Sequence, residues 1–199
     1  TCIFAKDTLA TWKAPAGVAL NSDFTVKVRL QDGVWHTLSS YLIKVDEVRD
    51  TRHYVENASM AIFDFTGKVE VAVTYNLGEV QTAKVRPLSY DIPFQIDGNT
   101  VTFTLEHPRN LSVEVNGDIF HNLHLFTGSP ERTIPDKDNP EVIYFGPGIH
   151  TVKNGELRVP SGKTVYLAGG AVLMGRVLIE NVHDVKLLGR GIIDYSIKG

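Results

Sequence analysis

Two aspartates near the end of the chain come nearest, by type and spacing, to a catalytic pair. Asp184 and Asp194 stand ten residues apart. Glycoside hydrolysis uses two carboxyl groups, about 6.5–9.5 Å apart for inversion and about 5–5.5 Å apart for retention. The surrounding sequence repeats every 20 residues, so these two side chains are expected far apart, half a turn around a coil. We interpret Asp184 as a turn residue and Asp194 as the end of a strand, and assign neither as catalytic.

Two histidines form the nearest approach to a metal site. His121 and His124 lie in an apolar stretch typical of a strand, where residues three apart point to opposite faces. The two imidazoles cannot easily bind one ion, and structural histidines are favoured. Gly189-Arg190-Gly191 lacks the Lys and the following helix of a phosphate-binding loop, so it is predicted to be a corner of the coil. No catalytic, metal-binding or cofactor-binding residue is assigned, and no cofactor is expected.

The coil is predicted from a repeat in residues 141–199. Short apolar-x-apolar pieces recur with a period of 20 residues, separated by Gly, Asn or Pro and without helical spacing. This pattern indicates stacked parallel strands about 4.8 Å apart, the arrangement of a parallel β-helix. Two hairpins that resemble each other by chance are the alternative. Aligned residues are Leu157 with Val177, Val159 with Ile179, Val165 with Val185, Leu167 with Leu187, and Val172 with Ile192.

An earlier turn of the coil aligns at an offset of 23 residues, with three extra residues expected to leave the stack on one flank. In this alignment Val142 falls on Val165, Tyr144 on Leu167, and Ile149 on Val172.

The first 128 residues are predicted to form an antiparallel β-sandwich. Apolar and polar residues alternate in many short segments, which indicates strands with one buried and one solvated face. Turn signals separate these segments, among them Asp32-Gly33 and Asn116-Gly117. The segments are centred on Phe24–Leu30, Tyr41–Val45, Val69–Val73, Val101–Leu105 and Leu111–Val115.

Aromatic side chains in this half are numerous enough to fill a sandwich core, and we expect most of them there. An exposed subset would instead stack on sugar rings. The residues in question include Trp12, Trp35, Phe63, Phe65, Phe120 and Phe126.

Composition sets further limits on the class of protein. The chain has 199 residues, 43% hydrophobic and 22% charged, with a net charge of −3 and no long like-charge run. This is typical of a folded protein and gives no sign of a nucleic-acid partner. No run of about 18 apolar residues predicts a membrane-spanning segment. The proline-punctuated residues 129–140 are predicted to link the sandwich, residues 1–128, to the coil, residues 141–199.

The start of the sequence suggests a processed or truncated product, because it begins at Thr1 without Met. The single Cys2 excludes an internal disulfide framework. Its position would suit a lipid-modified Cys exposed by signal cleavage, and an unmodified terminal Cys is the simpler interpretation.

Five runs carry a family resemblance. Val142–His150, Leu157–Val172 and Gly189–Asp194 resemble the opening turns of polygalacturonase-type glycoside hydrolases, which are right-handed parallel β-helices. Val85–Tyr90 and Pro108–Phe126 are similar to the N-terminal sandwich of their dextranase and isopullulanase relatives. The resemblance therefore implies an all-β, pectin-lyase-like fold and inverting hydrolysis of a polysaccharide, either galacturonan or a neutral glucan. It also implies a secreted, periplasmic or cell-surface location.

The catalytic aspartates that the family implies occur in Asn-Thr-Asp and Asp-Asp motifs, and neither motif is present here. In the family, the turn matched by Gly189–Asp194 precedes the catalytic turns. We therefore expect the natural protein to continue beyond Gly199, with its active site there, because an uncapped coil end would be prone to aggregate. A non-catalytic carbohydrate-binding or adhesion module is one alternative, and a β-helix polysaccharide lyase is a second.

Overall fold

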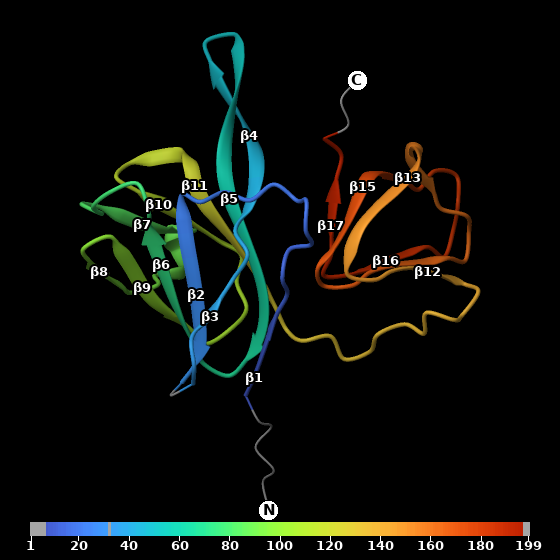
Figure 1. Ribbon diagram of the computed structural model, residues 1–199, viewed down its shortest axis with the longest axis horizontal. Coiled ribbons are helices and arrows are strands. Elements are labelled where there is room, and N and C mark those ends of the chain that lie inside the picture. The colour runs from blue at the N-terminus through green and yellow to red at the C-terminus, as the bar shows by residue number, and fades with distance from the viewer. Residues whose placement is uncertain (1–6, 32, 197–199) are drawn as a thin grey trace, which may run out of the picture. The chain divides into compact units, whose positions relative to one another are not determined.

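The computed structural model describes residues 7–31 and 33–196, and within them the fold is all-β, as predicted (Figure 1). The one helical turn in these residues is the short 3-10 helix η1 (Leu88–Tyr90). Among them, no helix has the length and apolar character needed to span a membrane. The predictions for Cys2 and for Asp32 in the first turn lie outside the described residues.

The chain divides into two compact units, and the division is not a single cut. The first unit contains residues up to Trp12 together with Ala19–Pro130. The second contains the short segment Lys13–Val18 together with the residues from Glu131 onward.

Two β-sheets build the first unit. One is six-stranded, with the order β1-β5-β11-β10-β7 and β4 paired to β5. Its strands are β1 (Thr8–Thr11), β4 (Tyr41–Arg49), β5 (Arg52–Thr66), β7 (Ala83–Arg86), β10 (Leu111–Val115) and β11 (Asp118–Gly128). The other is five-stranded, with the order β3-β2-β6-β9-β8. Its strands are β2 (Phe24–Leu30), β3 (His36–Thr37), β6 (Val69–Tyr75), β8 (Phe94–Asp97) and β9 (Thr100–Leu105).

A single hydrophobic core lies between these two sheets, as in a β-sandwich. Alternation places every second side chain in it: Val69, Val71 and Val73 of β6 are fully buried, whereas Glu70 between them faces outward. The same core contains Phe63 of β5, from the other sheet. The strand segments that alternation predicted are all present.

One pairing in the six-stranded sheet is parallel, in contrast to the antiparallel pairing expected from the sequence. β11 runs parallel to β5, with Leu123 opposite Ser59. The 15-residue strand β5 also lacks regular alternation, since its buried positions include Ala58 and Ser59 in succession. It lies between β4, β1 and β11, so both its edges are paired.

The aromatic side chains divide between core and surface. Phe63 and Phe65 are fully buried, with ring centroids 5.6 Å apart, so the prediction of a core role is confirmed for them. For Trp35 and Phe126 it is wrong, because these side chains are 40% and 39% exposed. Trp35 follows the turn after β2, and Phe126 faces outward between the inward residues of β11.

Six parallel-paired strands form the coil of the second unit. They stack in two ladders, β12-β14-β16 and β13-β15-β17, in which each strand pairs with its equivalent one turn later. This is how the opening turns of a parallel β-helix are built. The first ladder contains β12 (Val142–Phe145), β14 (Thr164–Leu167) and β16 (Lys186–Gly189). The second contains β13 (Gly148–Arg158), β15 (Ala171–Leu178) and β17 (Ile192–Asp194).

The register of the coil differs partly from the sequence alignment. Leu157 pairs with Val177 and Val172 with Ile192 at an offset of 20, and Ile149 with Val172 at 23, as predicted. In the other ladder the offset is 22 throughout. The predicted partners there are therefore wrong: Val165 pairs with Leu187, Leu167 with Gly189, Val142 with Thr164, and Tyr144 with Tyr166.

Corners of unequal length explain these offsets. Between Thr151 and Glu156, four residues of β13 stand opposite the single Gly175 of β15, and this bulge holds the three extra residues of the earlier turn. The one-residue error in β12 reverses its faces, so Ile143 and Phe145 pack against the core instead of the predicted residues.

Gly189 forms a tight corner between β16 and β17, as predicted for Gly189-Arg190-Gly191. Its φ is +116°, and a Cβ placed on it would lie 1.9 Å from the Leu167 carbonyl oxygen of the preceding turn. That same oxygen accepts hydrogen bonds from the Arg190 and Gly191 N–H groups, at 2.8 and 3.0 Å. Only glycine allows this close approach of two turns.

Candidate functional site

The two aspartates of the coil have separate local roles. Asp184 has a φ of 54° and lies in the corner before β16, where its carboxylate is 2.9 Å from the His183 ring. Asp194 ends β17 and accepts a hydrogen bond of 2.8 Å from the Ser196 N–H. The roles inferred from the sequence, turn residue and strand end, match these positions.

The two histidines of β11 have different surroundings. The His121 side chain is partly exposed and bridges two carboxylates, those of Asp118 at 2.9 Å and Glu56 at 3.1 Å. The His124 ring is half-buried, 6.5 Å from the Phe126 ring and nearly parallel to it. In the part of the chain that the structure describes, no three His, Cys, Asp or Glu side chains are grouped to hold a metal ion.

A chain of charged groups extends from His121 across three neighbouring strands. Glu56 of β5 contacts both His121 of β11 and, at 3.7 Å, Arg49 of β4. Arg49 also pairs with the mostly buried Glu47 and lies over the Tyr54 ring at 4.9 Å. Because His121 links β11 to β5 and Arg49 links β5 to β4, the cluster ties the long β4–β5 hairpin to the sheet.

The pKa values in this cluster favour a charged pair. The hydrogen bond to the Asp118 carboxylate raises the pKa of His121, and Glu56 adds to the effect. Partial burial alone would raise the pKa of Asp118, but N–H groups of His121 and Phe120 donate to its carboxylate and lower its pKa. Burial lowers the pKa of His124, which favours its neutral form. The geometry is that of a structural tie between neighbouring strands.

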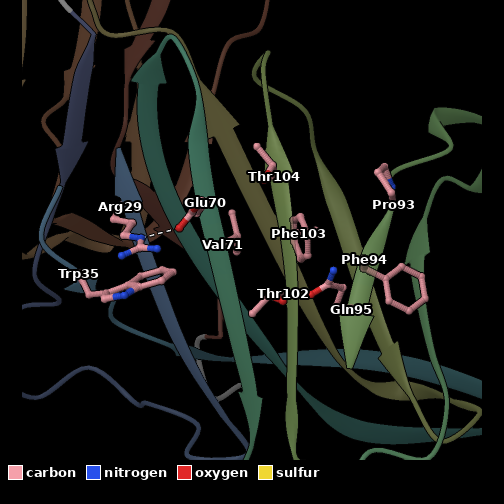
Figure 2. A pocket seen from close by; sticks show the side chains of 10 residues that line it. All are labelled: Arg29, Trp35, Glu70, Val71, Pro93, Phe94, Gln95, Thr102, Phe103 and Thr104. Atoms are coloured by element: carbon pink, nitrogen blue, oxygen red, sulfur yellow. Dashed lines mark hydrogen bonds and ion pairs between the residues drawn. The ribbon is translucent and has the colours of Figure 1, made fainter. Parts of the chain in front are cut away.

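A groove lies on the outer face of the five-stranded sheet (Figure 2). Its volume is about 520 Å³, and residues from β2, β6, β8 and β9 line it with the turn that carries Trp35. Val71 and Phe103 point into the core on the opposite side, so the floor of the groove consists of sheet backbone and the outward residues. The outward residues are Arg29, Glu70, Gln95, Thr102 and Thr104.

Trp35 is held at one side of this groove by its neighbours. The Arg29 guanidinium lies over the indole ring, 4.5 Å from its centroid, and Arg29 in turn pairs with Glu70 on the adjacent strand (Figure 2). The cation–π contact and the ion pair together restrict the rotamers of both side chains. Trp35 therefore offers a fixed aromatic surface although it is largely outside the core.

The other side of the groove is polar. Gln95 of β8 and Thr102 of β9 are cross-strand partners, and both side chains are exposed. Phe94 borders this side, but it pairs with the inward Phe103, so its ring lies on the opposite face from Gln95. Among the described residues, no hydrogen bond engages the side chains of Gln95, Thr102 or Thr104.

A smaller groove of about 280 Å³ lies on the six-stranded sheet. The exposed Phe126 ring and His124 form one part of it, and Arg86 and Asn110 another. Arg86 is paired with the buried Glu114, and the Asn110 side chain accepts a hydrogen bond from Thr127 N–H. Two of its polar side chains are thus already engaged within the protein.

Sequence reasoning missed the larger groove because its lining comes from four strands and a turn. One signal was available: Trp35 stands two residues after the Asp32-Gly33 turn, outside the alternating segment that ends at Leu30. An aromatic residue in such a position has no place in the inward pattern of either strand. It is therefore a candidate surface residue.

Comparison with solved structures shows the same fold elsewhere. The structure of Dex49A from Penicillium minioluteum is similar, with a TM-score of 0.62 and 17% sequence identity. The similarity covers 93% of this chain and 50% of that chain. No family model and no curated protein matches the sequence. At this identity the likeness is one of fold, and it includes both units of the chain.

Proposed function

We propose that this chain is the N-terminal part of an extracellular polysaccharide-degrading glycoside hydrolase. The observation that carries the proposal is the similarity to Dex49A over 93% of the chain, which includes both the sandwich and the coil. Dex49A is a dextranase, a β-helix glycoside hydrolase. The runs Val142–His150 and Pro108–Phe126 independently resemble that group of enzymes.

The catalytic residues belong, in this proposal, to coil turns beyond Gly199. The chain spans only half of the length of Dex49A, and the Asn-Thr-Asp and Asp-Asp motifs are absent from it. The last described turn has exposed apolar side chains, Leu187, Leu188 and Ile193, which a further turn would cover. Downstream aspartates would act with inversion, one as general acid and others to activate water. The sandwich then assists in binding the substrate.

The proposal is tested by reducing-sugar release from a panel of polysaccharides that contains neutral glucans and galacturonans. The 199-residue chain is compared with the longer product of its reading frame. We expect release only by the longer product, and the active substrate names the sugar class. Release by the short chain would overturn the downstream placement of the active site. Inactivity of both would instead favour the carbohydrate-binding or adhesion alternative.

A polysaccharide lyase on the same coil gives a different product. Lyases form an unsaturated sugar end that absorbs in the ultraviolet, whereas hydrolases do not. Absorbance of the same reaction mixtures therefore separates the two, and ultraviolet-absorbing products would refute hydrolysis.

A further inference from the structure

We propose that the groove on the outer face of the five-stranded sheet binds a segment of a neutral polysaccharide, with one sugar ring stacked on Trp35. The inference rests on the proposed function only in taking a polysaccharide as the ligand. It names a binding surface on the five-stranded sheet, and it favours one of the two substrate classes that the family resemblance left open.

The first support is the fixed aromatic surface. Trp35 is 40% exposed, yet Arg29 of β2 lies over its ring, and Glu70 of the adjacent strand holds Arg29 in an ion pair. The face of a pyranose ring that carries axial C–H bonds is apolar and packs well on an indole. Because the ring is already ordered, a ligand does not incur the entropy cost of immobilising it. A solvent-exposed Trp without such support would gain less on binding.

The second support is the row of unengaged polar groups beside the indole. Gln95 offers both amide donors and a carbonyl acceptor, and Thr102 and Thr104 each offer a hydroxyl. Sugar hydroxyls both donate and accept, so these groups match them. The groove extends over β2, β6, β9 and β8, which are three strand spacings of about 4.8 Å, or about 14 Å in all. An extended chain of sugar rings fits this shape better than a compact ligand.

The third support is the charge balance of the lining. Its two charged side chains, Arg29 and Glu70, neutralise each other in an ion pair. A galacturonan carries a carboxylate on every sugar and would require unpaired Lys or Arg in the groove. Within the described lining there is none, so the groove favours a neutral glucan.

The test is affinity electrophoresis of the 199-residue chain in native gels that contain dextran, pullulan or polygalacturonate. We expect a neutral glucan to retard the chain and polygalacturonate to leave its mobility unchanged. Trp35→Ala should weaken the retarding affinity at least about ten-fold, since a central aromatic contact is typically worth that much. Gln95→Ala should weaken it by a smaller factor.

The matched control is Phe126→Ala, which removes an aromatic ring of equal exposure from the other sheet. It should leave retardation unchanged, and thermal unfolding should show that both variants remain folded. The proposal is overturned if no neutral glucan retards the chain. It is equally overturned if Trp35→Ala and Phe126→Ala behave alike, or if only polygalacturonate binds.

The hydrolase proposal and the groove proposal can be refuted independently of each other. Binding that depends on Trp35, without sugar release by the longer product, would refute the hydrolase and keep the groove. Sugar release by the longer product, with retardation that Trp35→Ala does not change, would refute the groove and keep the hydrolase.

Discussion

Replacing Gly189 by Ala should release the last turn of the coil from the turn before it. The new Cβ would lie 1.9 Å from the Leu167 carbonyl oxygen, whereas a carbon normally stays about 3.3 Å or more from such an oxygen. The atom that blocks it is backbone in a paired strand, so it cannot rotate away. The corner itself must therefore move.

The expected loss of stability follows from the hydrogen bonds that this movement of the corner breaks. The Arg190 and Gly191 N–H groups lose their hydrogen bonds to Leu167, at about 1 kcal/mol each, and Ala at a φ of +116° adds about 1–2 kcal/mol. We expect a loss of about 3–4 kcal/mol in the local stability of β16 and β17, the sum of these contributions. Hydrogen exchange of peptides from residues 186–194, followed by mass spectrometry, measures it.

Gly162→Ala is the matched control in the same unit. Gly162 has a φ of +75°, but a Cβ placed on it would meet no atom within 4 Å. The Gly162→Ala substitution should therefore cost only the strain of the backbone angle, about 1–2 kcal/mol of stability. Equal loss of protection in the two variants would refute the argument that the close approach of the two turns, and not the backbone angle alone, requires glycine at position 189.

Two further predictions concern titratable groups. Because the pKa of His121 is raised in the folded state, its pairing with Asp118 stabilises the sandwich below the ordinary pKa and loses that effect as pH rises through the folded value. His121→Gln should thus cost more stability at about pH 5.5 than at about pH 8.5, on either side of the ordinary value of about 6.5. The difference should stay below about 1 kcal/mol, because the side chain is 43% exposed, and it should shrink in an Asp118→Asn background. Urea titrations measure it, and a pH-independent cost would contradict the assigned pairing. For the coil, Asp184→Asn and Asp194→Asn should leave reducing-sugar release by the longer product unchanged; loss of release with an unchanged fold would make that residue catalytic.

The strands of the sandwich could be predicted from sequence because each carries its own alternating signal. Val69, Val71 and Val73 identify β6 without reference to any other segment. β5 could not be predicted in this way, because Ala58 and Ser59 are both buried although successive residues of a strand point to opposite faces. Its parallel pairing with β11 depends on which distant strands the fold brings together, and local sequence patterns do not encode this.

The coil shows a different limit of prediction from sequence, which concerns the register of its strands. A constant offset of 20 residues describes the β15 and β17 partners, but corner lengths change the offset to 22 in the neighbouring ladder. An error of two residues preserves the inward face of β16, whereas the error of one residue at β12 reversed it. The groove beside Trp35 was beyond prediction for a related reason, since Arg29, Glu70 and Gln95 become neighbours only through strand pairing.

The segment Lys13–Val18 belongs to the coil unit, although more than one hundred residues of the other unit separate it from Glu131 in sequence. A Cβ placed on Gly17 would lie 3.5 Å from the Ile149 side chain. During synthesis, this segment leaves the ribosome long before its partners exist, and domains generally fold in the order in which they are made. The sandwich can therefore form first, but Lys13–Val18 must wait until residues 131 onward are translated. A fragment that starts at Glu131 would lack it at every stage, so the coil should not be expressed as a contiguous piece of the gene.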